Sequence, residues 1–196
     1  DKRGKKCLAG FANNLVESII NKTPLLLDFV YGIDYGGITS KFYPIDGQQR
    51  LTTLLLLAWL CGKINKSWVF RYESRRAIET FVKSMLANDP PALIVPKNNQ
   101  EEKANSKNGY SPLCSKYIQE QDWFHQACLS DPGISGMLEM LDSLYDKLIC
   151  RNTDINDLSL DNIVFLVNYL DVNTKSYDHI YLKMNSRGKE LTEWDN

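Results

Sequence analysis

The feature that most constrains the fold is the sequence FYPIDGQQRLTTLLLLAWLCG at residues 42–62. The segment from Ile38 to Ile45 is rich in apolar and β-branched residues, a pattern that predicts a strand. Leu51 to Cys61 is an apolar run with two threonines inside it; it suits a buried helix and is too short to span a membrane. The polar residues DGQQR, Asp46 to Arg50, are therefore expected at a strand-to-helix corner.

The rest of the chain predicts an α+β domain in which helices outnumber strands. A β-hairpin is expected where Leu25 to Tyr31 and Ile38 to Ile45 flank a glycine-containing reversal. A further strand is expected at Asn162 to Leu170, and SWVFRY at residues 67–72 suggests a short one. The other expected helices are Phe11 to Asn21, a helix capped by Ser74, Ser115 to Leu129, and Gly133 to Arg151.

Two segments bear on domain organisation. Residues 96–111 have almost no apolar content and predict a mobile insertion. Thr192 with Asp195 resembles the start of a helix, at which the sequence ends. We expect a single domain over residues 1–196 that is truncated at both ends.

Composition and charge exclude several classes of protein. The net charge is −1, so no global attraction draws the chain to nucleic acid or to an anionic membrane. The five cysteines contain no C-x-x-C pair, which predicts reduced thiols in a cytoplasmic protein. His125 and Cys128 have no second pair to complete a four-ligand set, so no metal site is predicted from protein ligands alone.

The corner DGQQR has the composition of an anion site. The first N–H groups of a helix lack partners within it, and this end of the helix dipole is positive. Gly47 lets the backbone approach a ligand oxygen, Arg50 adds a bidentate cation, and Gln48 and Gln49 add neutral donors. Asp46 repels phosphate unless Mg²⁺, water or a ribose hydroxyl lies between them. The mixture suits a nucleotide better than a bare anion.

A second interpretation of the same residues stays open. Asp46 would cap the helix, Arg50 would pair with Asp46 or another acid, and both glutamines would be solvated.

A second polar corner, NSRGK at residues 185–189, also carries cations and hydrogen-bonding groups. Its cations are either hydrated in a loop or shared with the first corner, because a triphosphate needs more positive charge than Arg50 supplies. We expect the two corners to line one pocket, with these residues facing it: Asn185, Arg187 and Lys189.

The two motifs IDGQQRLTTLLLL and IYLKMNSRGKELTEWDN resemble the N-terminal domain of GmrSD-type, modification-dependent restriction endonucleases, over about residues 11–196. The resemblance implies a ParB/sulfiredoxin-like small sheet with a helix-rich extension. It also implies an antiphage regulatory module that binds and hydrolyses a nucleoside triphosphate with Mg²⁺ and senses modified DNA. The implied partners are a nucleotide, DNA, and an HNH-type nuclease domain, C-terminal or in trans, with no membrane.

The resemblance also implies roles for individual residues. Asp46 would bind the metal or orient the water, and Arg50 would stabilise the charge of the transition state. The nucleotide would be bound by Gly47, Gln48, Gln49, Arg50, Asn185, Arg187 and Lys189.

The sequence departs from the family pattern in two respects. Residues 1–10 lack the usual I-P-x-x-Q-R-x-Y-x-W stretch, so the pocket is expected to be incomplete and hydrolysis slow. No HNH motif is present, so this chain is not expected to cut DNA. The alternatives are a DNA-binding specificity module without hydrolysis and an inactive structural fragment.

Overall fold

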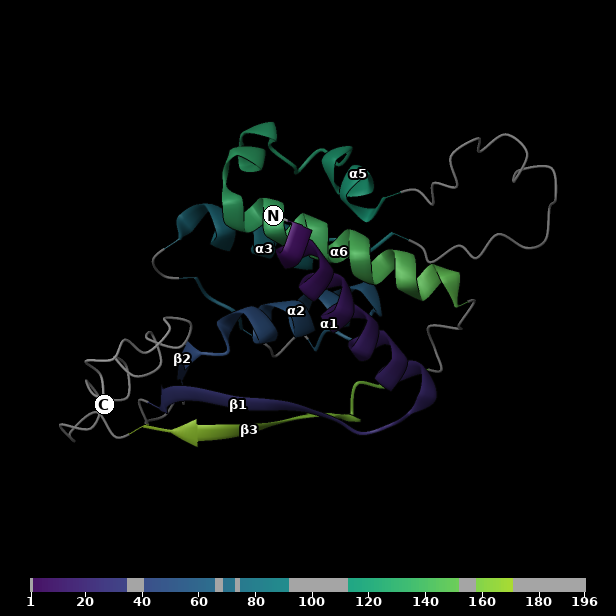
Figure 1. Cartoon of the computed structure of the whole chain (residues 1–196). Coiled ribbons are helices and arrows are strands. Elements are labelled where there is room, and N and C mark those ends of the chain that lie inside the picture. The colour runs from purple at the N-terminus through teal and green to yellow at the C-terminus, as the bar shows by residue number, and fades with distance from the viewer. Residues whose placement is uncertain are drawn as a thin grey trace. The chain divides into compact units, whose positions relative to one another are not determined.

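The computed structural model describes residues 2–34, 41–65, 69–72, 75–91, 113–151 and 158–170, with side chains from residue 10 onward. The described elements form an α+β fold, as predicted (Figure 1). In chain order they are α1 (Lys2–Asn21), β1 (Leu25–Asp34), β2 (Phe42–Asp46), α2 (Gln48–Leu60), α3 (Arg76–Leu86), α5 (Cys114–Gln119), the 3₁₀ helix η1 (Gln126–Ser130), α6 (Pro132–Cys150) and β3 (Ile163–Tyr169).

The chain divides into two compact units. The helical unit comprises Asp1–Leu25 and Thr52–Ile163, and the sheet unit comprises Leu26–Leu51 and Val164–Asn196. One boundary falls inside α2, so the first turn of this helix belongs to the sheet unit and the remainder to the helical unit.

The core of the helical unit is built around α6. This helix contacts α1, α3, α5 and η1 (Figure 1), and its apolar residues recur at helical spacing from Ile134 to Leu148 and are buried. The second half of α2 is buried without a break from Leu55 to Leu60, as expected for a helix that is apolar on all sides. The predicted helices Phe11 to Asn21, Leu51 to Cys61 and Gly133 to Arg151 are therefore confirmed, with shifted ends.

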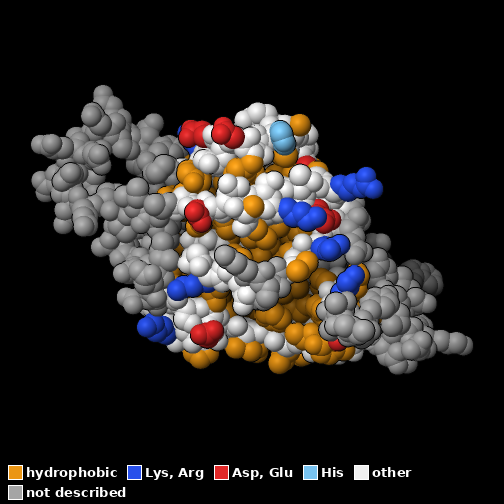
Figure 2. Space-filling view, turned by 180° about the vertical axis from the view of Figure 1, so that it is seen from behind, with side chains coloured by type: hydrophobic (Ala, Val, Ile, Leu, Met, Phe, Trp, Pro, Cys, Tyr) orange, Lys and Arg blue, Asp and Glu red, His pale blue; other side chains and the backbone are white. Residues whose placement is uncertain are grey.

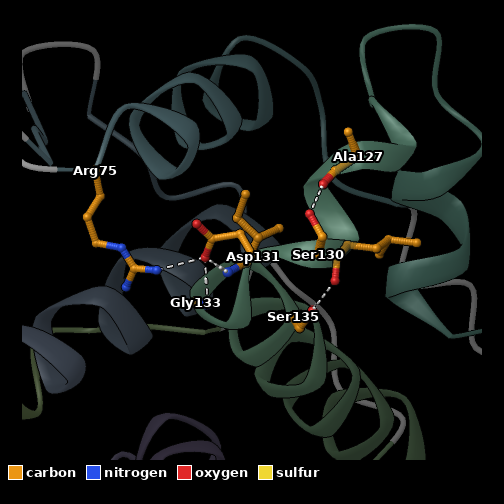
Figure 3. Close-up of polar contacts among 8 residues, drawn as sticks. Arg75, Ala127, Ser130, Asp131, Gly133 and Ser135 are labelled. Carbon is orange, nitrogen blue, oxygen red and sulfur yellow. Dashed lines mark hydrogen bonds and ion pairs between the residues drawn. The ribbon is translucent and has the colours of Figure 1, made fainter.

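Polar contacts fix the ends of these helices. The carboxylate of Asp131 accepts hydrogen bonds from the backbone N–H groups of Gly133 and Ile134, at 2.7 and 3.3 Å, and caps α6. The same carboxylate oxygen accepts from the guanidinium of Arg75 at 2.8 Å (Figure 3). Arg75 occupies the N-cap position of α3 and makes no capping bond there. The predicted cap, Ser74, lies outside the described residues.

The single helix predicted from Ser115 to Leu129 was wrong. α5 ends at Gln119, and a turn separates it from η1. The turn brings Trp123 and Phe124 against Phe81 of α3, with ring centroids 6.0 and 6.2 Å away. Aromatic packing of this kind competes with continuation of the helix.

The sheet has the strand order β2-β1-β3. β1 and β2 pair antiparallel, which confirms the predicted hairpin, although residues 35–40 of its reversal lie outside the described part. β1 and β3 run parallel, because Leu25 N–H donates to Asn162 O at one end and Leu170 N–H donates to Gly32 O at the other. The ring of Phe42 lies across Gly32, where an added Cβ would be 2.4 Å from it, and meets the ring of Tyr169 edge-on.

The strand Asn162 to Leu170 is confirmed as β3, whereas the described residues 69–72 of SWVFRY form no strand. Tyr72 in that segment instead has its hydroxyl 2.8 Å from the hydroxyl of Thr52 in α2. The polar insertion at residues 96–111 lies outside the described residues. Among the helices described, none combines the length and apolarity needed to cross a membrane.

Candidate functional site

The DGQQR corner joins β2 to α2, as the sequence predicted. Asp46 ends the strand, Gly47 forms the link, and the helix begins at Gln48, earlier than the expected Leu51. The carbonyl of Gly47 accepts the first helical hydrogen bond, from Leu51 N–H at 3.0 Å. The first turn of α2 therefore consists of the polar residues Gln48, Gln49 and Arg50.

Gly47 is required at this corner for two reasons. Its φ of 87° lies in the left-handed region that favours glycine. A Cβ added here would lie 2.9 Å from Cγ2 of Val30 in β1, which is closer than carbon atoms approach without strain. The corner therefore packs directly against β1.

Asp46 is oriented by the local backbone. Its Oδ1 accepts a hydrogen bond of 2.8 Å from Gly47 N–H. The register of the hairpin pairs Tyr31 with Asp46 and Gly32 with Pro44, so Ile45 forms a bulge just before the acid. Bulges of this kind redirect neighbouring side chains and are frequent beside functional sites.

The glutamines are exposed at the surface of the corner. Gln48 donates through Nε2 to the carbonyl of Pro44 at 2.8 Å, which folds its side chain back along β2. Neither glutamine is buried, so both stay accessible to a ligand from solution.

Arg50 lies between two acids. Its Nη1 donates to the carbonyl of Leu27 at 3.4 Å and is 3.8 Å from Oδ2 of Asp28, while its Nη2 is 3.6 Å from Oδ2 of Asp46. These distances exceed the 2.7–2.9 Å that is typical of charge-assisted hydrogen bonds. The guanidinium is thus held by electrostatic attraction and by one long hydrogen bond, and the Arg50 side chain is 25% exposed.

Asp28 is the site residue that the sequence interpretation missed. It belongs to β1, and its φ of 40° is unusual for a residue with a side chain; Asp tolerates this conformation better than most residues. The alternation of buried and exposed residues breaks here, since both Asp28 and Phe29 are exposed. A single acid within the apolar run LLLDFVY was the signal that could have identified it.

The pairing of Arg50 with Asp46, and with another acid, is the arrangement that the alternative interpretation expected. Binding of a nucleotide by the same residues stays a prediction. Asn185, Arg187 and Lys189 lie outside the described residues, and so does their expected convergence with the DGQQR corner.

Other candidate groups in the described residues have structural roles. Asp131 and Arg75 cap and connect helices, and the serine hydroxyls beside them donate to the carbonyls of Ala127 and Leu129 (Figure 3). Burial raises the pKa of Cys61 and of Cys114 to about 12, which keeps both as neutral, unreactive thiols. No group of three or more His, Cys, Asp or Glu side chains is placed to hold a metal ion within the part of the chain described.

Comparison with known proteins identifies the family. The family model described as "GmrSD restriction endonuclease, N-terminal domain" matches residues 12–196, which includes the DGQQR corner, the whole sheet unit and the helical unit from residue 12 onward. Searches of curated proteins and of solved structures returned no significant match, so the relation to the ParB and sulfiredoxin folds stays a prediction. Because the family model covers nearly the whole chain, the protein belongs to the family of GmrSD restriction endonuclease N-terminal domains.

Proposed function

We propose that the corner from Asp46 to Arg50 binds the phosphate groups of a nucleoside triphosphate. On this proposal the chain is the nucleotide-hydrolysing, regulatory module of a restriction system that acts on modified phage DNA. The observation that carries it is the position of Arg50: it lies in the first turn of α2, its guanidinium is partly exposed, and its polar contacts with other described residues are all longer than 3.3 Å.

A phosphate group would improve on these contacts. Its oxygens accept short, bidentate hydrogen bonds from a guanidinium, and the first-turn N–H groups of α2 and the positive end of its dipole favour negative charge at the same end. Gly47 adopts the φ of 87° that turns the chain from β2 into α2 and so places the start of the helix at this corner. These features support binding of phosphate at the start of α2.

Asp46 supplies the acid that hydrolysis needs. Its Oδ1 is fixed by Gly47 N–H, and its carboxylate is 38% exposed. In this position it would orient a water that attacks the terminal phosphorus, while the bond to the bridging oxygen breaks and phosphate and the nucleoside diphosphate leave. Arg50 would stabilise the charge that develops on the phosphoryl oxygens.

The acids of the corner also fit a Mg²⁺-bound nucleotide. Mg²⁺ in such sites is held by one or two carboxylates together with substrate phosphates and water, and the carboxylates of Asp28 and Asp46 lie near the two terminal nitrogens of the Arg50 guanidinium. When bound, Mg²⁺ would neutralise part of the phosphate charge. Asn185, Arg187 and Lys189 are proposed to supply further hydrogen bonds and positive charge.

Family membership supports the wider context. A domain described as the N-terminal part of a restriction endonuclease is proposed to act together with a nuclease domain of HNH type and, through it, on DNA. The Gly-x-x-Arg spacing of Gly47 and Arg50 is the feature on which we base the proposed relation to the ParB and sulfiredoxin proteins.

The test compares the wild-type chain with Arg50→Ala and Asp46→Asn. Melting temperature and released phosphate are measured with each common nucleoside triphosphate in the presence of Mg²⁺. Arg50→Ala should weaken binding by about 10- to 150-fold, the equivalent of a charge-assisted hydrogen bond worth about 1.5–3 kcal/mol. Asp46→Asn should lower turnover more than affinity, because it removes a charge needed by water or metal rather than by phosphate.

Arg76→Ala is the matched control, since Arg76 is an exposed arginine in the first turn of another helix, α3. It should leave both measurements unchanged. Equal binding and turnover in all four proteins would contradict the proposal. If no triphosphate binds and Arg50→Ala instead weakens salt-dependent binding of DNA, the alternative of a DNA-binding module is favoured.

A further inference from the structure

The charged side chains described around Arg50 carry more negative than positive charge. Within the described residues around Arg50, two carboxylates, those of Asp28 and Asp46, face one guanidinium. A cradle built only to attract phosphate would not surround its cation with acids, because each carboxylate repels the ligand. The second acid, Asp28, therefore needs its own explanation.

The two acids are held differently. Asp46 accepts a hydrogen bond of 2.8 Å from Gly47 N–H through Oδ1 and faces Arg50 with Oδ2. The Asp28 carboxylate is 68% exposed and approaches Arg50 only to 3.8 Å, and in the described part of the chain no group donates a hydrogen bond to it. Asp46 is thus anchored, whereas Asp28 is the acid that can leave Arg50 at low cost.

The backbone of β1 places Asp28 close to Arg50. One nitrogen of the guanidinium, Nη1, contacts both the carbonyl of Leu27 and the carboxylate of Asp28. Asp28, whose carboxylate makes one of these two contacts, has a positive φ of 40°. Backbone conformations of this kind persist where the surrounding structure enforces them, and they concentrate at functional sites.

From these observations we propose that Asp28 is a displaceable counter-ion of Arg50. It keeps the guanidinium in place and partly neutralised, and a polyphosphate binds by replacing Asp28 on Nη1. The inference rests on the proposed function, since it assigns the incoming ligand to the same site. The same site would discriminate against metal-free polyphosphate, because the released Asp28 carboxylate stays nearby and repels uncompensated negative charge.

The experiment uses inorganic tripolyphosphate as the probe, with and without Mg²⁺, and measures affinity by calorimetry. Asp28→Asn and Asp28→Gly both remove the charge and both tolerate positive φ, so neither introduces backbone strain. Each should bind the metal-free probe about threefold to tenfold more tightly than wild type, the range expected for loss of one nearby charge in a partly solvated site. The gain in affinity from Mg²⁺ should shrink in both variants.

Asp34→Asn is the control, because it removes the same charge from the far end of the same strand. It should bind like wild type. A purely structural role for Asp28 would alter the melting temperature of the free protein and leave the Mg²⁺ dependence of binding unchanged, and that result would overturn the proposal.

The remaining outcomes separate this inference from the proposed function. If wild type binds the probe and the Asp28 variants bind it equally or less tightly, the inference is wrong while the proposed function stands. If wild type does not bind and both variants do, the inference holds and nucleotide binding by the natural chain fails. If none of the proteins binds, both are wrong.

Discussion

The helical unit and the sheet unit differ in where their backbones are irregular. In the helical unit, aliphatic side chains such as Leu141 and Leu144 are fully buried, and the positive φ angles of Lys22 and Gly62 come just after the ends of α1 and α2. In the sheet unit, positive φ angles occur within β1, at Asp28, and at the corner, at Gly47, beside a bulge at Ile45. These irregularities surround Arg50, which suggests that the fold tolerates local strain where charged groups must be placed and relies on regular helices for stability.

The two units also differ at the surface. Large apolar side chains of β1 and β3 are exposed, and hydrophobic atoms reach the surface along the lower edge of Figure 2. In the sheet unit these residues are Leu26, Phe29, Val164, Leu166, Val167 and Tyr169. Less apolar surface per residue is thus removed from water on the sheet than in the helical core, so substitutions in the helical unit should have the larger effect on stability.

The largest effect is expected from Leu141→Ala in α6. Leu141 is fully buried, and truncation leaves a cavity that costs about 2–5 kcal/mol of unfolding free energy. Urea denaturation followed by circular dichroism measures this loss. Leu129→Ala makes the same chemical change at a side chain that is 40% exposed and should cost far less; equal losses would remove the distinction between core and surface in this unit.

A smaller loss of stability, with a larger loss of binding, is expected from Gly47→Ala. The new Cβ meets Val30 at a positive φ, a strain of about 1–3 kcal/mol. Gly62→Ala is the control that isolates the strain of a positive φ, since Gly62 has a φ of 61° and no atom of the described residues near the site of its missing Cβ. Urea denaturation should show a larger loss of stability for Gly47→Ala than for Gly62→Ala, and tripolyphosphate titration a larger loss of affinity. Equal losses in the two variants would mean that the contact of the new Cβ with Val30 is unimportant.

The smallest effect is expected from Asp131→Asn. Burial alone would raise the pKa of Asp131, but hydrogen bonds from Gly133 and Ile134 N–H and the charge of Arg75 lower it below 3.8. A lowered pKa stabilises the folded protein above the ordinary value, and this contribution disappears as the pH falls through the folded-state value. Wild type should therefore melt a few degrees above the variant near pH 6.

The difference between the two melting temperatures should vanish in acid, once the pH is below the lowered pKa of Asp131 in the folded protein. Asn still caps a helix, so only the charge is removed. Asp122→Asn, at an exposed acid in the turn before η1, should leave the wild-type pH profile unchanged. A difference in melting temperature between wild type and Asp131→Asn that persists at low pH would show that Asp131 stabilises the protein independently of its charge.

Much of the fold was predictable because periodicity is a local property. The apolar run after Arg50 and the run rich in apolar and β-branched residues before Asp46 predicted a helix and a strand, and the corner between them follows from the chain itself. The break between α5 and η1 was not predictable in this way, because it depends on Phe81, a residue distant in sequence, that packs against Trp123. Tertiary contacts outweighed local propensity there.

The candidate site was predictable only in part. The residues from Asp46 to Arg50 could be found because their polarity contrasts with their surroundings. The approach of Asp28 to Arg50 required the positive φ of Asp28 and the pairing register of β1, and neither is encoded by the residues near the corner. A sequence pattern identifies which residues are unusual, whereas strand register decides which of them meet.

The contact between Gly47 and Val30 limits how this corner can change over generations. A side chain at position 47 needs space that Val30 now occupies, at 2.9 Å from the site of the missing Cβ. Loss of volume at position 30 would have to come first, and each such step alone leaves a gap beside the corner. Drift at the two positions should therefore be correlated among descendants of this sequence, and a glycine at 47 should persist wherever a branched residue is inherited at 30.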